Sequence, residues 1–326
     1  MKTETIGIIG LDKATASIGL ALRHSDLGLS VIGFVKNRKE AASARDIGAV
    51  DETTGSLVKV IQAADILIVS TNVEEHEAIL EVIGDEVRDH TLIIDLSSLK
   101  GVGLKLADKY IKEGHYIGAQ PVLAAAWLAD GGQGINAAKS DMFERSVFCL
   151  MPSAKADPKA VETAVNLGRI LGAKPYFLDP YEYDSLMQGV ETIPGLLAAA
   201  VFRSVSQSTG WRDLLRFAGT DFALATVSLE NPDIAALALN DRASTLRWMD
   251  SAIEELGVMR RLVSEGDLER LSLILEDVLL EREKWLEERR KNAWAGADDD
   301  SPEYGAAGIG AQLFGFRRGS KKKDSD

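Results

Sequence analysis

The first half of the chain alternates short apolar runs with segments of helical periodicity. The runs are mostly rich in Ile and Val and have few polar positions, which is typical of strands buried on both faces of a sheet. They lie at Thr5–Gly10, Ser30–Val35, Asp65–Ser70, Thr91–Asp95, His115–Gly118, Ser146–Met151 and, later, Pro175–Leu178. The helical segments lie between them, at Ala14–Arg23, Arg38–Gly48, Glu74–Ile83, Gly101–Glu113 and Asp157–Leu171. Strands that alternate with helices predict βαβ units and a parallel sheet.

The pattern changes at about Asp179, after which no run has the character of a strand. The remaining apolar positions recur every three or four residues and predict helices over Tyr181–Ser206, Asp213–Val227, Arg242–Glu265 and Asp267–Asn292. The sequence therefore predicts a Rossmann-like α/β domain over residues 1–179 and an all-helical domain over residues 180–294. Residues 295–326 have low complexity, and we expect them to form a disordered tail.

Composition narrows the classes of partner. The 326 residues include 37 Lys and Arg against 50 Asp and Glu, a net charge of −13, so we expect neither nucleic acid nor an anionic membrane as a partner. No apolar run approaches the ~18 residues of a membrane span. The single cysteine, Cys149, cannot form an internal disulfide, which fits a cytoplasmic protein. The four histidines and one cysteine show no metal-binding spacing, so we expect no metal site.

The turn after the first strand lies where dinucleotide-binding folds carry G-x-G-x-x-G, whose glycines permit a tight turn and close approach of the pyrophosphate. Here residues 10–15 read G-L-D-K-A-T, so only Gly10 matches. Asp12 brings a side chain and a negative charge to the second position, Thr15 replaces the third glycine, and Lys13 offsets part of the charge. The motif leaves two readings open, a dinucleotide site that includes Gly10, Leu11, Asp12 and Lys13, or a Rossmann-like sheet that binds no dinucleotide.

The end of the second strand bears on which cofactor would fit. An acidic residue at this place takes the ribose hydroxyls of NAD. Here Lys36, Asn37, Arg38 and Lys39 follow the strand instead. Cations at this place favour a 2′-phosphate, so we predict NADP in preference to NAD, with Lys36 and Arg38 as its ligands. The alternative is a solvated basic start of the next helix.

The order of motifs resembles that of the prephenate/arogenate dehydrogenase family. Ile8–Leu11 and Ser17–Leu22 read I-I-G-L and S-I-G-L-A-L, similar to the family's I-I-G-L-G-L-I-G-G-S-L-G-L-A-L. The other matches are Asp95–Lys100 to D-V-x-S-V-K, Gly118–Val122 to G-x-H-P-M, Asp141–Phe143 to D-L-F, and Gly210–Ala218 to G-F-R-D-x-T-R-I-A. The resemblance implies a two-domain enzyme with a helical dimerisation domain, and hence a homodimer. It also implies oxidative decarboxylation of prephenate or arogenate towards tyrosine, with hydride transfer to NAD(P).

The same resemblance places site residues on this sequence. The family serine falls on Ser98, which can hydrogen-bond the substrate hydroxyl; the alternative is that Ser97 and Ser98 cap the next helix. The family's catalytic histidine falls on Gln120, which can hold the hydroxyl but cannot take its proton at neutral pH. General-base help is worth about 10²–10⁴-fold in rate, so its loss predicts weak activity.

In the helical domain the resemblance is again partial. Residues 191–195 read E-T-I-P-G where the family has S-H-L-P-H, which places Thr192 at a substrate-binding position in place of a histidine. The family arginine that binds the substrate carboxylate falls on Arg216, with Arg212 one helical turn away; the alternative pairs them with Asp213 or solvent.

These residues support two hypotheses of different class. The first is a prephenate dehydrogenase-like, NADP- or NAD-dependent oxidoreductase of weak or altered activity that acts on a small-molecule substrate. The second is a non-catalytic relative that binds a small acid or a partner protein. A different reductase on the same architecture fits the order of motifs less well.

Overall fold

The computed structural model describes residues 4–292, so the predicted tail lies outside the described part. The chain divides into two compact units. One is Met1–Pro180 with the chain from Arg289 onward, and the other is Tyr181–Glu288. The last turn of the final helix therefore belongs with the first unit.

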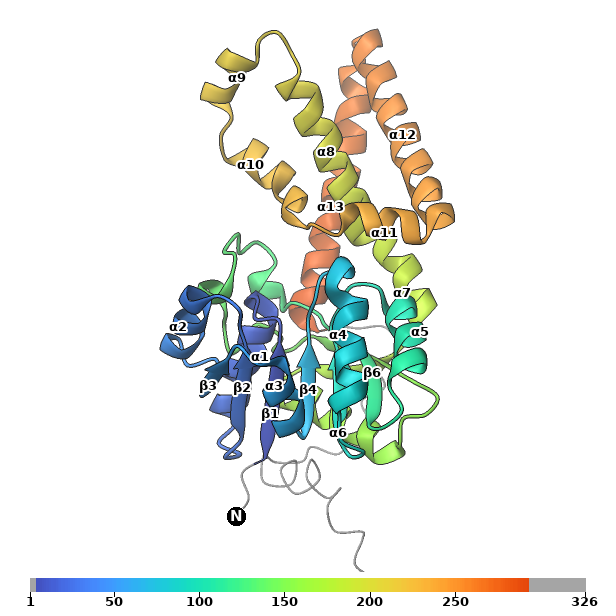
Figure 1. Cartoon of the computed structure of the whole chain (residues 1–326). Helices are drawn as coiled ribbons and strands as arrows, with labels where there is room; N and C mark the ends of the chain where they lie inside the picture. The colour runs from blue at the N-terminus through green and yellow to red at the C-terminus, as the bar shows by residue number, and fades with distance from the viewer. Residues whose placement is uncertain (1–3, 293–326) are drawn as a thin grey trace, which may run out of the picture. The chain divides into compact units, whose positions relative to one another are not determined.

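The first unit is built on an eight-stranded sheet in the order β3-β2-β1-β4-β5-β6-β7-β8 (Figure 1). The strands are β1 Thr5–Ile9, β2 Ser30–Phe34, β3 Glu52–Thr54, β4 Ile66–Val69, β5 Leu92–Asp95, β6 His115–Pro121, β7 Val147–Pro152 and β8 Lys174–Phe177. The expectation of a parallel sheet holds for β1 to β6. It is wrong for β7, which pairs antiparallel with β6, and for β8, which is parallel to β7. The connection from β6 to β7 contains no crossover helix, and a parallel neighbour requires one.

Helices cover both faces of this sheet. One face carries α1 Lys13–His24, α2 Arg38–Asp46 and α6 Pro158–Ile170, and the other carries α3 Leu57–Ala63, α4 Val73–Glu86 and α5 Lys100–Tyr110. Successive strand residues point to opposite faces. Ile68 of β4 accordingly packs in the cluster with α1, while Leu67 and Val69 pack in the cluster with α4. The strands are apolar on both faces because both faces are buried.

The strand order reverses between β1 and β4, and ligands of such sheets bind at this switch point, outside the carboxyl ends of the strands. The chain is tightly packed there. Gly10 has φ +83°, and a Cβ added to it would lie 1.7 Å from the carbonyl oxygen of Ser70, which follows β4. Only glycine fits this position, so the first glycine of the motif has a structural requirement of its own.

Beyond β8 the described residues are helical, as predicted. The helices are α7 Pro180–Met187, a π-helical turn Gln188–Thr192, α8 Ile193–Ser206, α9 Trp211–Phe217, α10 Thr220–Thr226, α11 Ile234–Asn240, α12 Arg242–Glu265 and α13 Leu268–Lys291. The helix predicted over Asp213–Val227 is instead broken into α9 and α10, because Ala218 is extended and Gly219 follows it.

One helical stretch of this region bears on the expectation that no apolar run is long enough to span a membrane. Helix α7, the π turn and α8 form one continuous helical stretch, Pro180–Ser206, of 27 residues. An 18-residue window of it has a mean hydropathy of 1.3, so by length and composition this stretch could cross a membrane. In the structure 28% of that window is buried, and core helices of soluble proteins meet the same criterion.

Candidate functional site

The carboxyl ends of β1, β4, β5 and β6 lie along one edge of the sheet, because these four strands are parallel neighbours. The turns that leave this edge carry the residues that the sequence predicted for cofactor binding and catalysis. Gly10 follows β1, Ser98 follows β5, and Gln120 lies near the end of β6. The topology thus brings to one edge residues that are widely separated in sequence.

The turn between β5 and α5, residues 95–100, is held by a buried carboxylate. Asp95 is 1% exposed, and its Oδ1 accepts a hydrogen bond from the backbone N–H of Ser97 at 2.8 Å. Its Oδ2 accepts one from the hydroxyl of Tyr116 at 2.6 Å and lies 2.8 Å from Nε2 of His76. His76 comes from α4 and Tyr116 from β6, so Asp95 ties the turn to both neighbours.

The charge of Asp95 is stabilised by these partners. Burial by itself raises the pKa of the Asp95 carboxyl. The hydrogen bond and charge of His76, the charge of Lys100 and the hydroxyl of Tyr116 outweigh burial and hold this pKa below its usual range. Asp95 is therefore an anion at neutral pH.

A buried cation holds the other side of the same turn. Lys100 is 1% exposed, and its Nζ donates to the carbonyl oxygens of Ser97 at 2.6 Å and Asp95 at 3.1 Å. These bonds join the backbone just before the Ser98 position to the first residue of α5. One turn into α5, a Cβ on Gly103 would lie 2.4 Å from the Tyr116 hydroxyl, so glycine lets this helix approach the network.

Ser98 itself is half-buried at the surface of this turn. The alternative that Ser97 or Ser98 caps the helix is wrong, because the N-cap of α5 is Leu99 and no side chain caps it. Ser97 instead points to the turn after β4, where its Oγ lies 3.1 Å from the hydroxyl oxygen of Thr71. Gln120 is half-buried, and its amide makes a 3.5 Å contact with the adjacent carbonyl of Pro121.

The turn after β1 differs from a phosphate-binding loop. Asp12 caps α1: its Oδ1 accepts a hydrogen bond from the backbone N–H of Thr15 at 2.8 Å, and its Oδ2 accepts one from the hydroxyl of Ser70 at 2.7 Å. Thr15 completes a capping box by accepting from the backbone N–H of Asp12 at 2.9 Å. Lys13 is engaged elsewhere, with Asp130 and Gly132.

The cationic segment after β2 is partly neutralised by a residue that is distant in sequence. Nζ of Lys36 lies 3.4 Å from a carboxylate oxygen of Glu75, which belongs to α4. Asn37 caps α2 through Lys39, and Arg38 is exposed in the first turn of this helix. The sequence segment alone gave no sign of the carboxylate of Glu75.

The predicted substrate residues of the second unit lie on different helices. Arg216 of α9 pairs with Asp213 at 2.9 Å, both exposed, which is the pairing the sequence left open. Arg212 is exposed on the same helix. Thr192 ends the π turn; its side chain is 1% exposed, and its hydroxyl makes no hydrogen bond within the described residues. Its position alone therefore does not present it to a ligand.

Sequence reasoning did not identify three residues of this edge, namely His76, Tyr116 and Ser70. Their contacts with Asp95 and Asp12 span 19, 21 and 58 positions along the chain. Of the three, His76 was the easiest to identify from the sequence, because the chain has only 4 histidines and this one follows a strand by a few residues.

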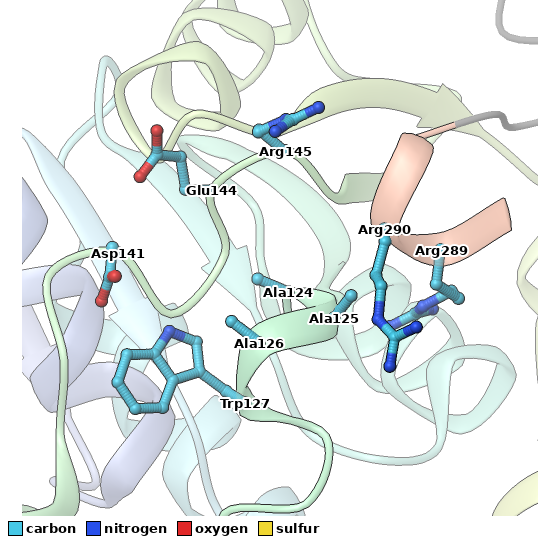
Figure 2. Close-up of a pocket in the computed structure, with 9 residues that line it drawn as sticks. All are labelled: Ala124, Ala125, Ala126, Trp127, Asp141, Glu144, Arg145, Arg289 and Arg290. Carbon is cyan, nitrogen blue, oxygen red and sulfur yellow. The ribbon is translucent and has the colours of Figure 1, made fainter. Parts of the chain in front are cut away.

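A separate hollow of about 440 Å³ lies in the first unit, between the segment after β6 and the one before β7 (Figure 2). Trp127 and three alanines line one side, with the carboxylates of Asp141 and Glu144 nearby. Arg289 and Arg290, from the end of α13, line it too. None of the catalytic, substrate-binding or cofactor-binding residues predicted from the sequence lines this hollow.

Comparison with known proteins agrees with this architecture. Residues 18–177 match the family profile described as prephenate dehydrogenase, nucleotide-binding domain. The prephenate dehydrogenase of Bacillus subtilis (strain 168) is 26% identical over 275 residues, which cover 82% of this chain and 72% of that protein.

Solved structures show the same fold. One is the prephenate dehydrogenase of A. aeolicus in complex with hydroxyphenyl propionate and NAD⁺, with a TM-score of 0.73 and 20% identity over 87% of this chain and 99% of that one. Another is the arogenate dehydrogenase of Synechocystis, with a TM-score of 0.63 and 21% identity over 86% of this chain and 99% of that one. The profile, the relative and the shared fold agree with the motifs along the carboxyl edge, and the chain belongs to the prephenate/arogenate dehydrogenase family.

Proposed function

We propose that this chain is an NAD(P)-dependent oxidoreductase that carries out oxidative decarboxylation of prephenate, arogenate or a closely similar acid, with weak activity. The observation that carries the proposal is the β5–α5 turn. Its backbone is fixed by buried Asp95 and Lys100, and it presents Ser98 at the edge where Gln120 also lies. A rigid turn of this kind is what positions a polar side chain for a reaction.

The roles of the two polar residues follow from their chemistry. The hydroxyl of Ser98 and the amide of Gln120 can each hydrogen-bond a substrate hydroxyl. Neither side chain can take the proton at neutral pH, so the proton has to leave to water. Because general-base help is worth about 10²–10⁴-fold, we expect turnover to be slower by a factor in this range than with a histidine at position 120.

Binding of the substrate carboxylates is assigned to Arg216, with Arg212 as a further ligand. Thr192, which the family motif also places at the substrate, is 1% exposed and would have to become accessible to take part. The exposed pair with Asp213 does not prevent this role, because exposed ion pairs are worth about 0–1 kcal/mol and exchange readily. A substrate carboxylate can therefore replace Asp213 as the partner of Arg216.

The cofactor fits this chain only in part. When bound, NAD(P) supplies the acceptor for the hydride. Lys36 and Arg38 follow β2, where dinucleotide-binding folds contact the ribose, and these cations favour NADP over NAD, although the Glu75 carboxylate beside Lys36 weakens that preference. The pyrophosphate position does not fit in the observed arrangement, because the Asp12 carboxylate caps α1 there.

Turnover tests the proposal directly. The full chain is incubated with prephenate or arogenate and saturating NADP⁺ or NAD⁺, and formation of the reduced cofactor is followed by absorbance. Slow but measurable turnover is expected, and Gln120→His should raise kcat by about 10²-fold or more because it restores a base. Gln207→His, on the exposed end of α8, serves as the control and should change nothing.

The alternative, a non-catalytic relative that binds a small acid or a partner protein, is favoured by the same two departures, Gln120 and Asp12. It would be preferred if neither the wild-type chain nor Gln120→His reduced either cofactor. Binding of prephenate without turnover would then identify the retained function.

We also propose that the protein is a homodimer that associates through its helical unit. None of the residues of α13 is buried in the single chain, although Leu275, Val278 and Leu279 share one stripe of this helix at spacings of three and four. Their exposed fractions are 53%, 56% and 52%. Light scattering coupled to size exclusion should give twice the chain mass, and Val278→Glu should shift the protein towards monomer.

A further inference from the structure

The N-terminus of α1 is the place at which folds of this kind bind an anion, and it is called the pyrophosphate seat below. The first N–H groups of a helix have no partner within it, and the helix dipole makes this end positive. In dinucleotide-binding folds the pyrophosphate takes this place, and the second glycine of the motif leaves room for it. In this chain the second glycine position is Asp12, whose carboxylate accepts the backbone N–H of Thr15 at 2.8 Å.

The carboxylate is held from a second side. Its other oxygen accepts a hydrogen bond from the hydroxyl of Ser70 at 2.7 Å, and Ser70 belongs to the turn after β4, across the switch point. This partner is fixed in place, because its backbone N–H donates to the carbonyl of Ile9 at 2.8 Å and its carbonyl packs on Gly10. Both oxygens of Asp12 thus have defined partners on two different strand ends.

The cation next to Asp12 in the sequence, Lys13, has its partners elsewhere. Nζ of Lys13 lies 3.1 Å from a carboxylate oxygen of Asp130 and 2.7 Å from the carbonyl oxygen of Gly132. The hydrogen bond from Lys13 is the main cause of the lowered pKa of the Asp130 carboxyl. Lys13 is therefore already neutralised and does not offset the charge of Asp12.

We infer that Asp12 is a tethered anion that occupies the pyrophosphate seat, so that a dinucleotide binds this chain only when the Asp12 carboxylate leaves the α1 N-terminus. Asp12 is then the residue that sets cofactor affinity. The affinity observed is the intrinsic affinity multiplied by the fraction of molecules in which the seat is open. This inference rests on the proposed function, because it concerns the cofactor of that reaction.

The test measures whether variants of Asp12 bind a dinucleotide more tightly than the wild type does. Isothermal titration of the full chain with NAD⁺ and with NADP⁺ is compared for the wild type, Asp12→Gly and Asp12→Asn. Asp12→Gly restores the glycine of the motif and should tighten binding of both dinucleotides by at least about tenfold, since it removes a like charge and a side chain from the seat. Asp12→Asn removes the charge but keeps the side chain, so its gain should be smaller.

Asp157→Gly is the matched control. Asp157 caps α6 through the backbone N–H of Lys159, as Asp12 caps α1, but it lies at the opposite end of the sheet from the switch point. The Asp157→Gly variant loses the same kind of helix cap and should bind dinucleotides as the wild type does.

Two results would overturn the inference. One is a wild-type chain that binds either dinucleotide as tightly as Asp12→Gly does, and in that case the proposed function stands. The other is an Asp12→Gly variant that binds neither more tightly than the wild type. If Asp12→Gly gains affinity and still turns over neither prephenate nor arogenate, the proposed function fails while the inference about the seat stands.

Discussion

Two strand-to-helix turns on one edge of the sheet are stabilised in opposite ways. The β5–α5 turn is held by charges that are 1% exposed, Asp95 and Lys100, and α5 has no side-chain cap. The β1–α1 turn is held by an exposed aspartate, Asp12, which caps its helix directly. The first turn matches the family motif and the second departs from it.

The difference shows which turn of such a site can change its sequence with little loss of folding stability. A buried ion needs all its partners, because an unpaired charge in the interior is strongly destabilising. The β5–α5 motif is therefore tied to His76 and Tyr116 as well as to its own residues. The β1–α1 turn needs only some acceptor for the first N–H groups of α1, and a side chain of the chain can replace a ligand in that role.

The largest effect is expected from breaking the buried turn. Lys100→Met keeps the length of the side chain but removes the cation that holds the carbonyls of Asp95 and Ser97. We expect the free energy of unfolding to fall by about 3–5 kcal/mol, as for other broken buried ion pairs. Urea denaturation measures it. Lys109→Met, at an exposed pair with Glu77, is the control and should leave the transition unchanged.

The loss of folding stability at acid pH that comes from this turn should depend on the Asp95 carboxylate. A carboxyl whose pKa is lower in the folded protein than in the unfolded chain stabilises the fold at neutral pH. That contribution begins to be lost as the pH falls below about 4, the ordinary pKa of an aspartate, and is fully lost below the folded pKa. Asp95→Asn should be less stable than the wild type at pH 7, and the difference should narrow as the pH falls from about 4 to 3. A constant difference across this range would show that the charge of Asp95 is not what holds the turn.

The preference between NADP and NAD tests the role of the exposed cations that follow β2. If Lys36 and Arg38 hold a 2′-phosphate, Arg38→Ala should weaken NADP⁺ binding by roughly tenfold and leave NAD⁺ binding unchanged. Glu75→Gln, which frees Lys36, should act in the opposite direction and strengthen NADP⁺ binding by a smaller factor. Titrations with both cofactors measure the ratio. Equal effects of Arg38→Ala on NAD⁺ and NADP⁺ would contradict the assignment.

The smallest effect concerns Asp12 as a cap. Asp12→Ala should lower the free energy of unfolding by about 1 kcal/mol, because the N–H of Thr15 and the hydroxyl of Ser70 lose their acceptor. Asp157→Ala at α6 should cost a similar amount. An Asp12→Ala protein that is more stable than the wild type would show that the carboxylate strains the turn rather than caps it.

Most of the first domain could be predicted from hydrophobic periodicity, because a strand buried on both faces leaves a continuous apolar run. The short strand Glu52–Thr54 was missed, since it is polar and lies at the sheet edge. The predicted direction of β7 was wrong because hydrophobic periodicity indicates which residues are buried and does not indicate the direction in which a strand runs. The seven-residue helix α3, Leu57–Ala63, was too short to stand out.

Part of the candidate site could be proposed from the sequence for a similar reason. Motifs located Ser98, Gln120 and the altered phosphate loop, because each lies within a few residues of a strand end. They could not supply His76 or Ser70, whose roles depend on contacts between strands that only the folded sheet makes.

The sequence by itself determined the order of strands and helices, the family and the departures at Asp12 and Gln120. These are local properties, set by which side chains follow one another. The tertiary structure alone decided what those departures do. It brought Ser70 to the Asp12 carboxylate, turned Lys13 to Asp130, and placed His76 and Tyr116 beside Asp95. The physical reason is that hydrogen bonds and ion pairs act over a few ångströms in space, and the sheet brings together residues that are tens of positions apart in the chain.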